Sequence, residues 1–195
     1  MKKIIFLIIT SLVFLSFPSI AQIQKGNILA GGDIANFNIG LQKGSAFSMT
    51  IDPKLAFFIK DNIAVGAYIN FGLQTIPGST GTITTYGIGP VARYYLSAKN
   101  SVSPLKHSRI FLEGNVGVSG INVPGGSNTN GLGIGIGPGF AYFITPNVGL
   151  ETLLKYNGLL GFGNTTTQSN LNLSVGFQIY LPSKHLSSHV ENDVK

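Results

Sequence analysis

The chain has 195 residues, of which 26 are glycine and only 10% are charged, whereas a soluble domain averages about 25% charged residues. It contains no cysteine, which excludes disulfides, thiolate metal sites and a lipid-anchored N-terminal cysteine. The formal net charge of +6 is scattered along the chain rather than gathered into a patch, so we expect no nucleic-acid partner.

The N-terminus has the organisation of a secretory signal peptide. Residues 1–3 are basic at Lys2 and Lys3, residues 4–17 are apolar, and residues 19–21 supply the small side chains of a cleavage site. The apolar run is shorter than the ~20 residues that span a bilayer as a helix. We therefore expect residues 1–21 to be removed on export. No apolar run of spanning length follows, so the mature chain is either soluble or crosses a membrane as strands.

Beyond the signal peptide, apolar residues recur at every second position in eight segments with breakers between them, which predicts β-strands. The last segment is the clearest, because Leu171, Leu173 and Val175 share one face with Phe177. Helical periodicity fits none of the segments. The predicted strands are residues 27–38, 45–59, 63–74, 82–96, 109–121, 132–144, 148–158 and 167–181.

The connections between these strands alternate in length. Residues 60–62 and 145–147 form tight turns, and the longer connections are rich in Gly, Ser, Thr and Asn. This alternation predicts an up-and-down barrel of the outer-membrane type. The connection at residues 97–108 is longer than that pattern predicts for the short-turn end. The longer loops are residues 75–81, 122–130 and 159–166.

Charged residues within the predicted strands avoid the faces that carry Ile, Leu, Val and Phe. A Lys or Arg facing the bilayer midplane would cost about 2 to 4 kcal/mol, so this segregation predicts an apolar outer wall and a polar interior. A soluble lipocalin-like barrel would need the reverse. The charges on the interior faces are Asp33, Asp52, Lys54, Arg93, Glu113, Glu151 and Lys155.

Aromatic residues fall near both ends of the strands, which is typical of the two belts at membrane interfaces. The alternative is that they are scattered core residues. The group near the short turns is Phe57, Phe58, Tyr94, Tyr95, Tyr142, Phe143 and Tyr180, and the group near the long loops is Phe37, Phe47, Phe71, Tyr86 and Tyr156.

The segment GLGIGIGPGFAYF at residues 131–143 places glycine at alternate positions. The interior of an eight-stranded barrel is just wide enough for side chains, so a small face on one strand makes room for large groups on its neighbours. We expect this face to leave room for Glu113, Glu151 and Lys155. A phosphate-binding loop is excluded because no G-x-G-x-x-G or helix follows. The inward glycines are Gly133, Gly135, Gly137 and Gly139.

Counting residues outward from the turns predicts a layer of charges inside the barrel. Lys155 falls opposite Gly137, Glu113 falls opposite Gly137 or Gly139, and Arg93 falls beside Glu113. We therefore expect Glu113 to lie between Arg93 and Lys155, with Glu151 in the same structural layer.

Pro53, Pro90 and Pro138 lie within predicted strands on the outer side. Each lacks the N–H that a ladder hydrogen bond needs. We interpret them as β-bulges that shape the wall. The alternative is a lateral opening between strands.

Three segments, DNIAVG at residues 61–66, GPVARYY at 89–95 and YFITPNVGLE at 142–151, resemble the small outer-membrane β-barrel domain family of Gram-negative bacteria, especially its Bacteroidetes-type members. The resemblance covers residues 26–181. It implies an all-β, eight-stranded antiparallel up-and-down transmembrane β-barrel at residues 22–181. Many chains of the family end at the last strand, whereas this chain continues through residues 182–195, whose Ser-rich, charged composition predicts a flexible tail. The resemblance also implies a monomer in the outer membrane, in contact with lipid.

The final strand resembles the pattern that barrel-assembly machinery recognises, a polar residue, a glycine and two hydrophobic residues. The matching residues are Ser174, Gly176, Ile179 and Leu181. We expect that machinery to be a partner during biogenesis.

Catalysis by an outer-membrane barrel would be expected to use a histidine near the outer rim, and none lies there. His107 falls in an inner connection, and His185 and His189 come after the last strand. The spacing of His185 and His189 would suit a metal only if the tail were helical, whereas its composition favours disorder. We predict no catalytic residue, cofactor or metal.

The sequence leaves two functional hypotheses. The first is a structural or surface-interaction barrel without an open pore. The alternative is a conduit or binding site for small hydrophobic molecules with a lateral exit to the membrane.

Overall fold

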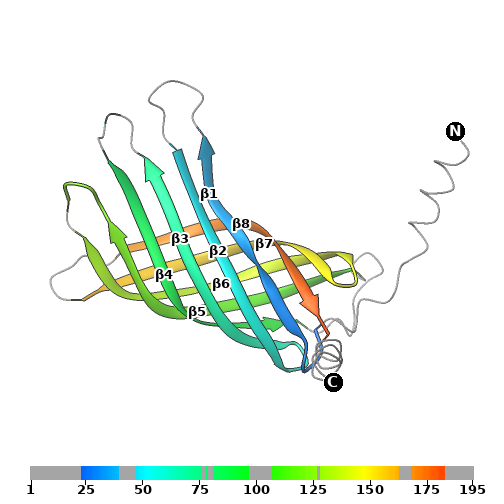
Figure 1. The fold of residues 1–195 in the computed structure, drawn as a ribbon. Helices are drawn as coiled ribbons and strands as arrows, with labels where there is room; N and C mark the ends of the chain where they lie inside the picture. The colour runs from blue at the N-terminus through cyan, green and yellow to red at the C-terminus, as the bar shows by residue number, and fades with distance from the viewer. Residues whose placement is uncertain are drawn as a thin grey trace, which may run out of the picture.

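A computed structural model describes residues 23–39, 47–75, 78, 81–96, 107–126, 128–162 and 168–182. Eight antiparallel strands form a closed barrel in which each strand pairs with its chain neighbour and β1 pairs with β8 (Figure 1). The predicted fold class is confirmed. Among the described residues, no helix is long and apolar enough to cross a membrane. The strands are β1 (Ile28–Ile39), β2 (Phe47–Lys60), β3 (Ile63–Thr75), β4 (Thr82–Tyr95), β5 (Ser108–Asn122), β6 (Thr129–Thr145), β7 (Val148–Gly161) and β8 (Gln168–Leu181).

The strand bounds differ most from the prediction at the facing ends of β6 and β7. Each strand extends three residues further into what the sequence presented as a glycine-rich loop, and Gly131 pairs with Gly161 there. A Cβ atom at Gly131 would overlap the carbonyl oxygen of Leu160. The glycine therefore permits a close approach of two strands, so it continues the ladder instead of ending it.

The two ends of the barrel differ. At one end, called the turn side, residues 61–62 join β2 to β3 and residues 146–147 join β6 to β7. The start of β1 and the end of β8 lie at this end as well (Figure 1). Ile23 is buried there, and its carbonyl oxygen accepts a 2.9 Å hydrogen bond from the backbone N–H of Asn62. The opposite end is called the loop side. The predicted signal peptide and residues 183–195 of the predicted tail lie outside the described residues.

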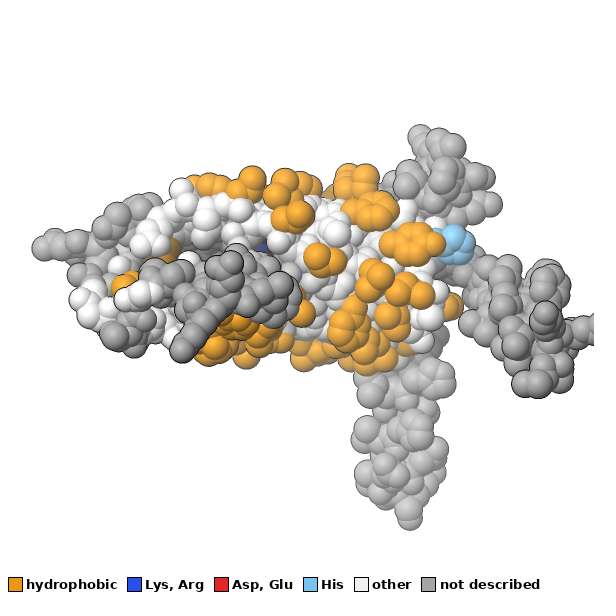
Figure 2. Space-filling view, turned by 90° about the horizontal axis from the view of Figure 1, so that it is seen from above, with side chains coloured by type: hydrophobic (Ala, Val, Ile, Leu, Met, Phe, Trp, Pro, Cys, Tyr) orange, Lys and Arg blue, Asp and Glu red, His pale blue; other side chains and the backbone are white. Residues whose placement is uncertain are grey.

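The outer wall of the barrel is apolar. Large hydrophobic side chains are exposed along every strand on which side chains are described, and Figure 2 shows hydrophobic groups gathered over the wall. Among the charged residues of the described strands, Lys60 alone is exposed, and it lies at the turn-side end of β2. All seven charged residues assigned to interior faces are buried. The predicted separation of apolar and charged faces is confirmed.

The turn-side aromatics do not form one belt as predicted. Phe57, Tyr94 and Tyr142 are exposed on the wall. The other four residues of that group, Phe58, Tyr95, Phe143 and Tyr180, are buried inside the barrel. Successive side chains of a strand point to opposite faces, so of two adjacent aromatics only one can meet the surroundings. Sequence position near a turn therefore did not decide which face an aromatic occupies.

The interpretation of Pro53, Pro90 and Pro138 as bulges is wrong. Register shifts occur elsewhere, near residues 35–38, 58–60 and 143–145. At each proline the ladder to one neighbouring strand is interrupted, yet the pairing register is the same on both sides of the gap. The wall stays closed beside Pro90, where a Cβ atom at Gly89 would overlap the carbonyl oxygen of Val116. The missing N–H therefore removes ladder bonds without inserting a residue.

Candidate functional site

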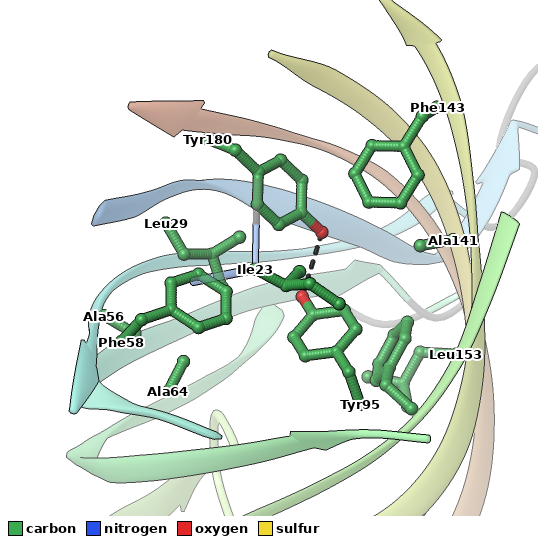
Figure 3. Packing of buried hydrophobic residues seen from close by; sticks show 11 residues of the cluster. Ile23, Leu29, Ala56, Phe58, Ala64, Tyr95, Ala141, Phe143, Leu153 and Tyr180 are labelled. Carbon is green, nitrogen blue, oxygen red and sulfur yellow. Dashed lines mark hydrogen bonds between the residues drawn. The ribbon is translucent and has the colours of Figure 1, made fainter. Parts of the chain in front are cut away.

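The lumen contains three successive layers, and the first is an apolar layer at the turn side. Tyr95 lies 5.8 Å from Phe58 and 5.6 Å from Phe111 between ring centroids, and Phe143 lies 5.1 Å from Tyr180. Figure 3 shows Phe58, Tyr95, Phe143 and Tyr180 pointing from different strands into the interior of the barrel. The aromatic layer consists of Ile23, Leu29, Ala56, Phe58, Ala64, Tyr95, Phe111, Ala141, Phe143, Leu153 and Tyr180.

The second layer is a buried ionic network centred on Glu113. This carboxylate accepts hydrogen bonds from Lys54 at 2.8 Å, from Arg93 at 2.6 Å and from Lys155 at 3.4 Å. Arg93 also donates to Glu151 at 2.7 Å. The six side chains of this ionic layer balance three acids against three bases. They are Asp33, Lys54, Arg93, Glu113, Glu151 and Lys155.

The aromatic and ionic layers are joined by hydrogen bonds. The Tyr180 hydroxyl lies 2.9 Å from the Tyr95 hydroxyl and donates to Glu151 at 2.8 Å (Figure 3 shows the tyrosine pair). Arg93 donates to the Tyr95 hydroxyl at 3.0 Å, and its guanidinium carbon lies 4.0 Å from the ring centroid of Phe111. Buried charges are stable only when they are paired and hydrogen-bonded, and these groups satisfy one another. The turn-side half of the lumen is thus filled by interlocking side chains.

The third layer is a polar cavity of about 600 Å³ in the loop-side half of the lumen, called the loop-side cavity. Lys155 and Asp52 lie at its inner end, and Asp52 accepts a hydrogen bond from Asn70. Most of the inward side chains are amides and hydroxyls. They include Asn36, Ser48, Thr50, Asn70, Gln74, Thr85, Asn115, Ser119, Asn157, Gln168, Asn170 and Asn172.

The glycines of β6 face the interior and serve different layers. Glu113 pairs with Gly137, so the Glu113–Lys155 contact crosses this glycine. Gly139 meets the Phe111 ring, and Glu151 pairs with Ala141 rather than with a glycine.

Further along β6, the glycines meet polar side chains of the loop-side cavity. Gly135 lies between Asn115 and Asn157, and Gly133 meets Ser119.

The ionic layer contains two members that the sequence analysis did not assign to it, Asp33 and Lys54. Lys54 donates to Asp33 at 2.7 Å and connects that carboxylate to Glu113. Both were predicted to face inward, but no turn count had related β1 and β2 to β5. The hydroxyls of Tyr95 and Tyr180 were also missed. The alternation of faces along a strand could have placed Tyr95 in the interior, because Tyr95 is two residues from Arg93 and so shares its face.

The four residues of the predicted assembly signal lie on β8 in two orientations. Ser174 is buried, and a Cβ atom at Gly176 would overlap the Asp33 carboxylate. Leu181 is exposed on the wall and Ile179 is half-buried. Gly176 therefore has a packing role in the barrel interior that is independent of any signal.

His107 is exposed at the turn side, and His185 and His189 lie outside the described residues. Within the described part of the chain, no three His, Cys, Asp or Glu side chains are grouped so that they could hold a metal ion.

Comparisons with known proteins relate this architecture to outer-membrane barrels through structure alone. No family model and no curated protein sequence matches the chain. The structure of Neisserial surface protein A matches with a TM-score of 0.52 at 19% identity, over 78% of this chain and 95% of that one. The N-terminal β-barrel domain of Pseudomonas aeruginosa OprF matches with a TM-score of 0.51 at 11% identity, over 80% and 98% of the two chains. A match to Yersinia pestis outer membrane protein Ail has a TM-score of 0.49 at 12% identity, over 80% and 100%.

At these identities the first two matches describe a shared architecture, and a fold of this kind hosts unrelated functions. The closed antiparallel barrel with an apolar wall and a charged interior is the arrangement that a barrel in a membrane requires. The chain has the fold of the eight-stranded outer-membrane β-barrels.

Proposed function

We propose that this chain is an integral outer-membrane β-barrel that does not form an open pore and that has a structural or surface-interaction role at its loop side. The observation that carries the proposal is the filled turn-side half of the lumen. The aromatic layer and the ionic layer lie in series across the interior, and Tyr180 is bonded to both Tyr95 and Glu151.

The outer surface supports membrane insertion. A barrel leaves no unpaired strand edge, which is the condition for strands in hydrocarbon. The exposed wall residues Ile69, Ile88, Val118 and Ile136 lie on four different strands, β3 to β6. Placing such a wall in lipid removes it from water, whereas a soluble protein would expose an apolar patch far larger than usual.

The alternative proposal is a conduit for small hydrophobic molecules with a lateral exit. Two observations disfavour it. Most of the inward side chains of the loop-side cavity are amides and hydroxyls, with Ile83, Ile121 and Leu159 among the rest, and the ionic layer lies beneath it. The described wall is also closed beside Gly89 and Gly137, where neighbouring backbone leaves no room for a Cβ atom.

Several further features belong to this proposal. We infer that the protein is not an enzyme and needs no cofactor, that it is a monomer in contact with outer-membrane lipid, and that barrel-assembly machinery reads Ser174, Gly176, Ile179 and Leu181. We also infer that residues 1–21 are a signal peptide and that residues 182–195 are a flexible tail. The chain is further inferred to be related to the Bacteroidetes-type members of the small outer-membrane β-barrel domain family. The composition of the termini and the three resembling segments support these inferences.

Two measurements test the proposal. Purified barrel in detergent should migrate differently in SDS gels before and after boiling, because a closed barrel resists SDS until it is heated. In planar bilayers the same sample should show no stable conductance steps, since eight strands enclose no open aqueous channel. Identical migration together with solubility in the absence of detergent would refute the membrane assignment. Large reproducible steps would refute the closed lumen.

A further inference from the structure

The amide and hydroxyl side chains that line the loop-side cavity are not needed to close the barrel, which its strand pairing achieves. We infer that this cavity is a binding site for a neutral, hydroxyl-rich ligand, of the class of a mono- or disaccharide or the end of a longer glycan. The inference rests on the proposed function in one respect, because a glycan outside the cell reaches the cavity only if the loop side faces outward.

The amide side chains of the cavity supply the hydrogen bonds that such a ligand needs. Asn70, Asn115 and Asn157 come from β3, β5 and β7 and line one continuous space. Each amide offers donors and an acceptor, which suits hydroxyl groups that both donate and accept. The cavity volume of about 600 Å³ lies within the range of small-molecule sites, roughly 300 to 1,000 Å³.

A glycine gives two of these amides the room that they occupy, because a Cβ atom at Gly135 would meet the side-chain oxygens of Asn115 and Asn157. Asn115, Gly135 and Asn157 are paired in a row across three strands, so two amides stand on either side of a residue without a side chain. The Asn115 Oδ1 atom is buried and accepts no hydrogen bond from the described residues. A buried polar atom without a partner is costly, and rotation of the Asn115 side chain toward the cavity that it lines would bring this atom within reach of a ligand hydroxyl.

The charges of the cavity favour a neutral ligand over an ion. Its described lining contains one acid, Asp52, and one base, Lys155. Asp52 is hydrogen-bonded to Asn70, and Lys155 contacts Glu113. An anion or a cation would therefore meet a compensated pair rather than a net charge. Tyr68 adds a ring at the same level, 6.0 Å from the Lys155 ammonium, against which the C–H face of a sugar can pack.

The experiment titrates the folded barrel with maltose, lactose and N,N′-diacetylchitobiose and follows the side-chain amide signals by NMR. The barrel is held in phosphatidylcholine nanodiscs, because the headgroups of maltoside and glucoside detergents would compete. We expect at least one sugar to give saturable shifts at Asn115 and Asn157, with a Kd on the order of 1 mM.

Two variants make the result specific. Asn115→Leu combined with Asn157→Leu preserves side-chain volume, removes both amides and should weaken binding at least tenfold. In this variant and in the parent protein, the comparison is read from the Asn70 side-chain amide, which lines the same cavity. Asn122→Leu is the matched control, since Asn122 is exposed at the end of β5 and does not line the cavity. It should leave binding unchanged. Both variants should retain heat-dependent migration, which shows that the barrel has formed.

Absence of saturable shifts with all three sugars would overturn the inference, as would binding that the double variant does not weaken. Saturation by citrate or sulfate without saturation by any sugar would also overturn it, since it would identify an ion site. Conductance recordings on the same nanodisc-derived protein test the closed lumen separately. A failed titration with a non-conducting barrel would refute only the ligand, and a conducting barrel would refute the proposed function.

Discussion

The turn-side and loop-side halves of the lumen are enclosed by the same eight strands, yet one is filled and the other is open. In the turn-side half, large aromatic rings and long charged side chains meet across the barrel axis. In the loop-side half, the inward residues are mostly Asn, Ser and Thr, which reach less far and leave about 600 Å³. The number of strands sets the diameter of the lumen, but the size of the inward side chains decides whether the lumen is filled.

Strand β6 passes through both halves and shows the difference within one element. Gly139 and Gly137 lie in the filled half, where the neighbouring atoms are the Phe111 ring and the backbone of β7. Gly135 and Gly133 lie beside the cavity, where the neighbouring atoms are the ends of Asn115, Asn157 and Ser119. The same residue type therefore makes room for an aromatic ring and backbone in one half and for short polar side chains in the other.

The largest expected effect comes from the centre of the ionic layer. Glu113→Gln removes the acid that Lys54, Arg93 and Lys155 share, so a buried positive charge is left without compensation. We expect the free energy of unfolding, measured by urea titration in lipid vesicles, to fall by about 3 to 5 kcal/mol.

The control for this change restores charge balance. Glu113→Gln combined with Lys155→Met leaves the Lys54–Asp33 and Arg93–Glu151 pairs intact, so the double variant should be more stable than the single one. A double variant no more stable than Glu113→Gln would show that charge balance does not hold the filled half together.

The glycines of β6 give the next effect. A Cβ atom at Gly137 would overlap the Leu154 carbonyl oxygen and lie 2.6 Å from the Lys155 Cα atom, and the backbone of a central strand cannot move aside. We expect Gly137→Ala to cost about 1 to 3 kcal/mol of unfolding free energy.

Gly135→Ala is the matched change in the open half. Its Cβ atom would meet the side-chain oxygens of Asn115 and Asn157, which can rotate into the cavity. Alanine also loses less backbone entropy on folding, so we expect the stability to stay within about 1 kcal/mol of the parent. Equal losses for both variants in the same urea titration would contradict the division into a filled and an open half.

The tyrosine pair links the two inner layers and gives a smaller effect. Tyr180→Phe removes the 2.8 Å hydrogen bond to Glu151 and the 2.9 Å contact with the Tyr95 hydroxyl. We expect a loss of about 1 to 2 kcal/mol in the same urea measurement. Tyr142→Phe is the control, because Tyr142 is exposed on the wall. Similar losses for the two variants would show that the hydroxyl network does not stabilise the filled half.

The smallest effect concerns a segment that belongs to neither half. Deleting residues 183–195 leaves the last strand and its pairing with β1 complete. Insertion into vesicles should be intact and the stability should change by less than about 0.5 kcal/mol. Loss of the heat-dependent shift in migration on this deletion would show that the segment is needed for assembly of the barrel.

Much of the candidate site was predictable because tight turns fix the register between adjacent strands. The turn at residues 145–147 relates β6 to β7, and counting from it places Lys155 beside Gly137. The structure pairs Gly139 with Leu153 in the same register. Counting across the longer connections was less exact, since the count across residues 122–130 placed Glu113 opposite Gly137 or Gly139. The structure pairs Glu113 with Gly137 and with Arg93.

Contacts across the barrel axis were not predictable by counting. Lys54 of β2 reaches Glu113 of β5, and Arg93 of β4 reaches Glu151 of β7. These strands are not neighbours, and the length and rotamer of each side chain decide which groups meet. The alternation of faces along each strand could place the short Asn and Ser residues near the loop side inside the barrel. The volume of the loop-side cavity, however, depends on how all of these side chains are arranged together.

The sequence by itself determined the strands, their inward and outward faces and the closed antiparallel order, because alternation has a period of two residues and a charge on the wrong face is costly. Only the tertiary structure decided that Phe58, Tyr95 and Tyr180 close the turn side, that the prolines interrupt the ladder without bulges, and that a polar cavity remains above Lys155. Strand patterns are local, whereas filling a lumen depends on the summed volumes and hydrogen bonds of side chains from all eight strands.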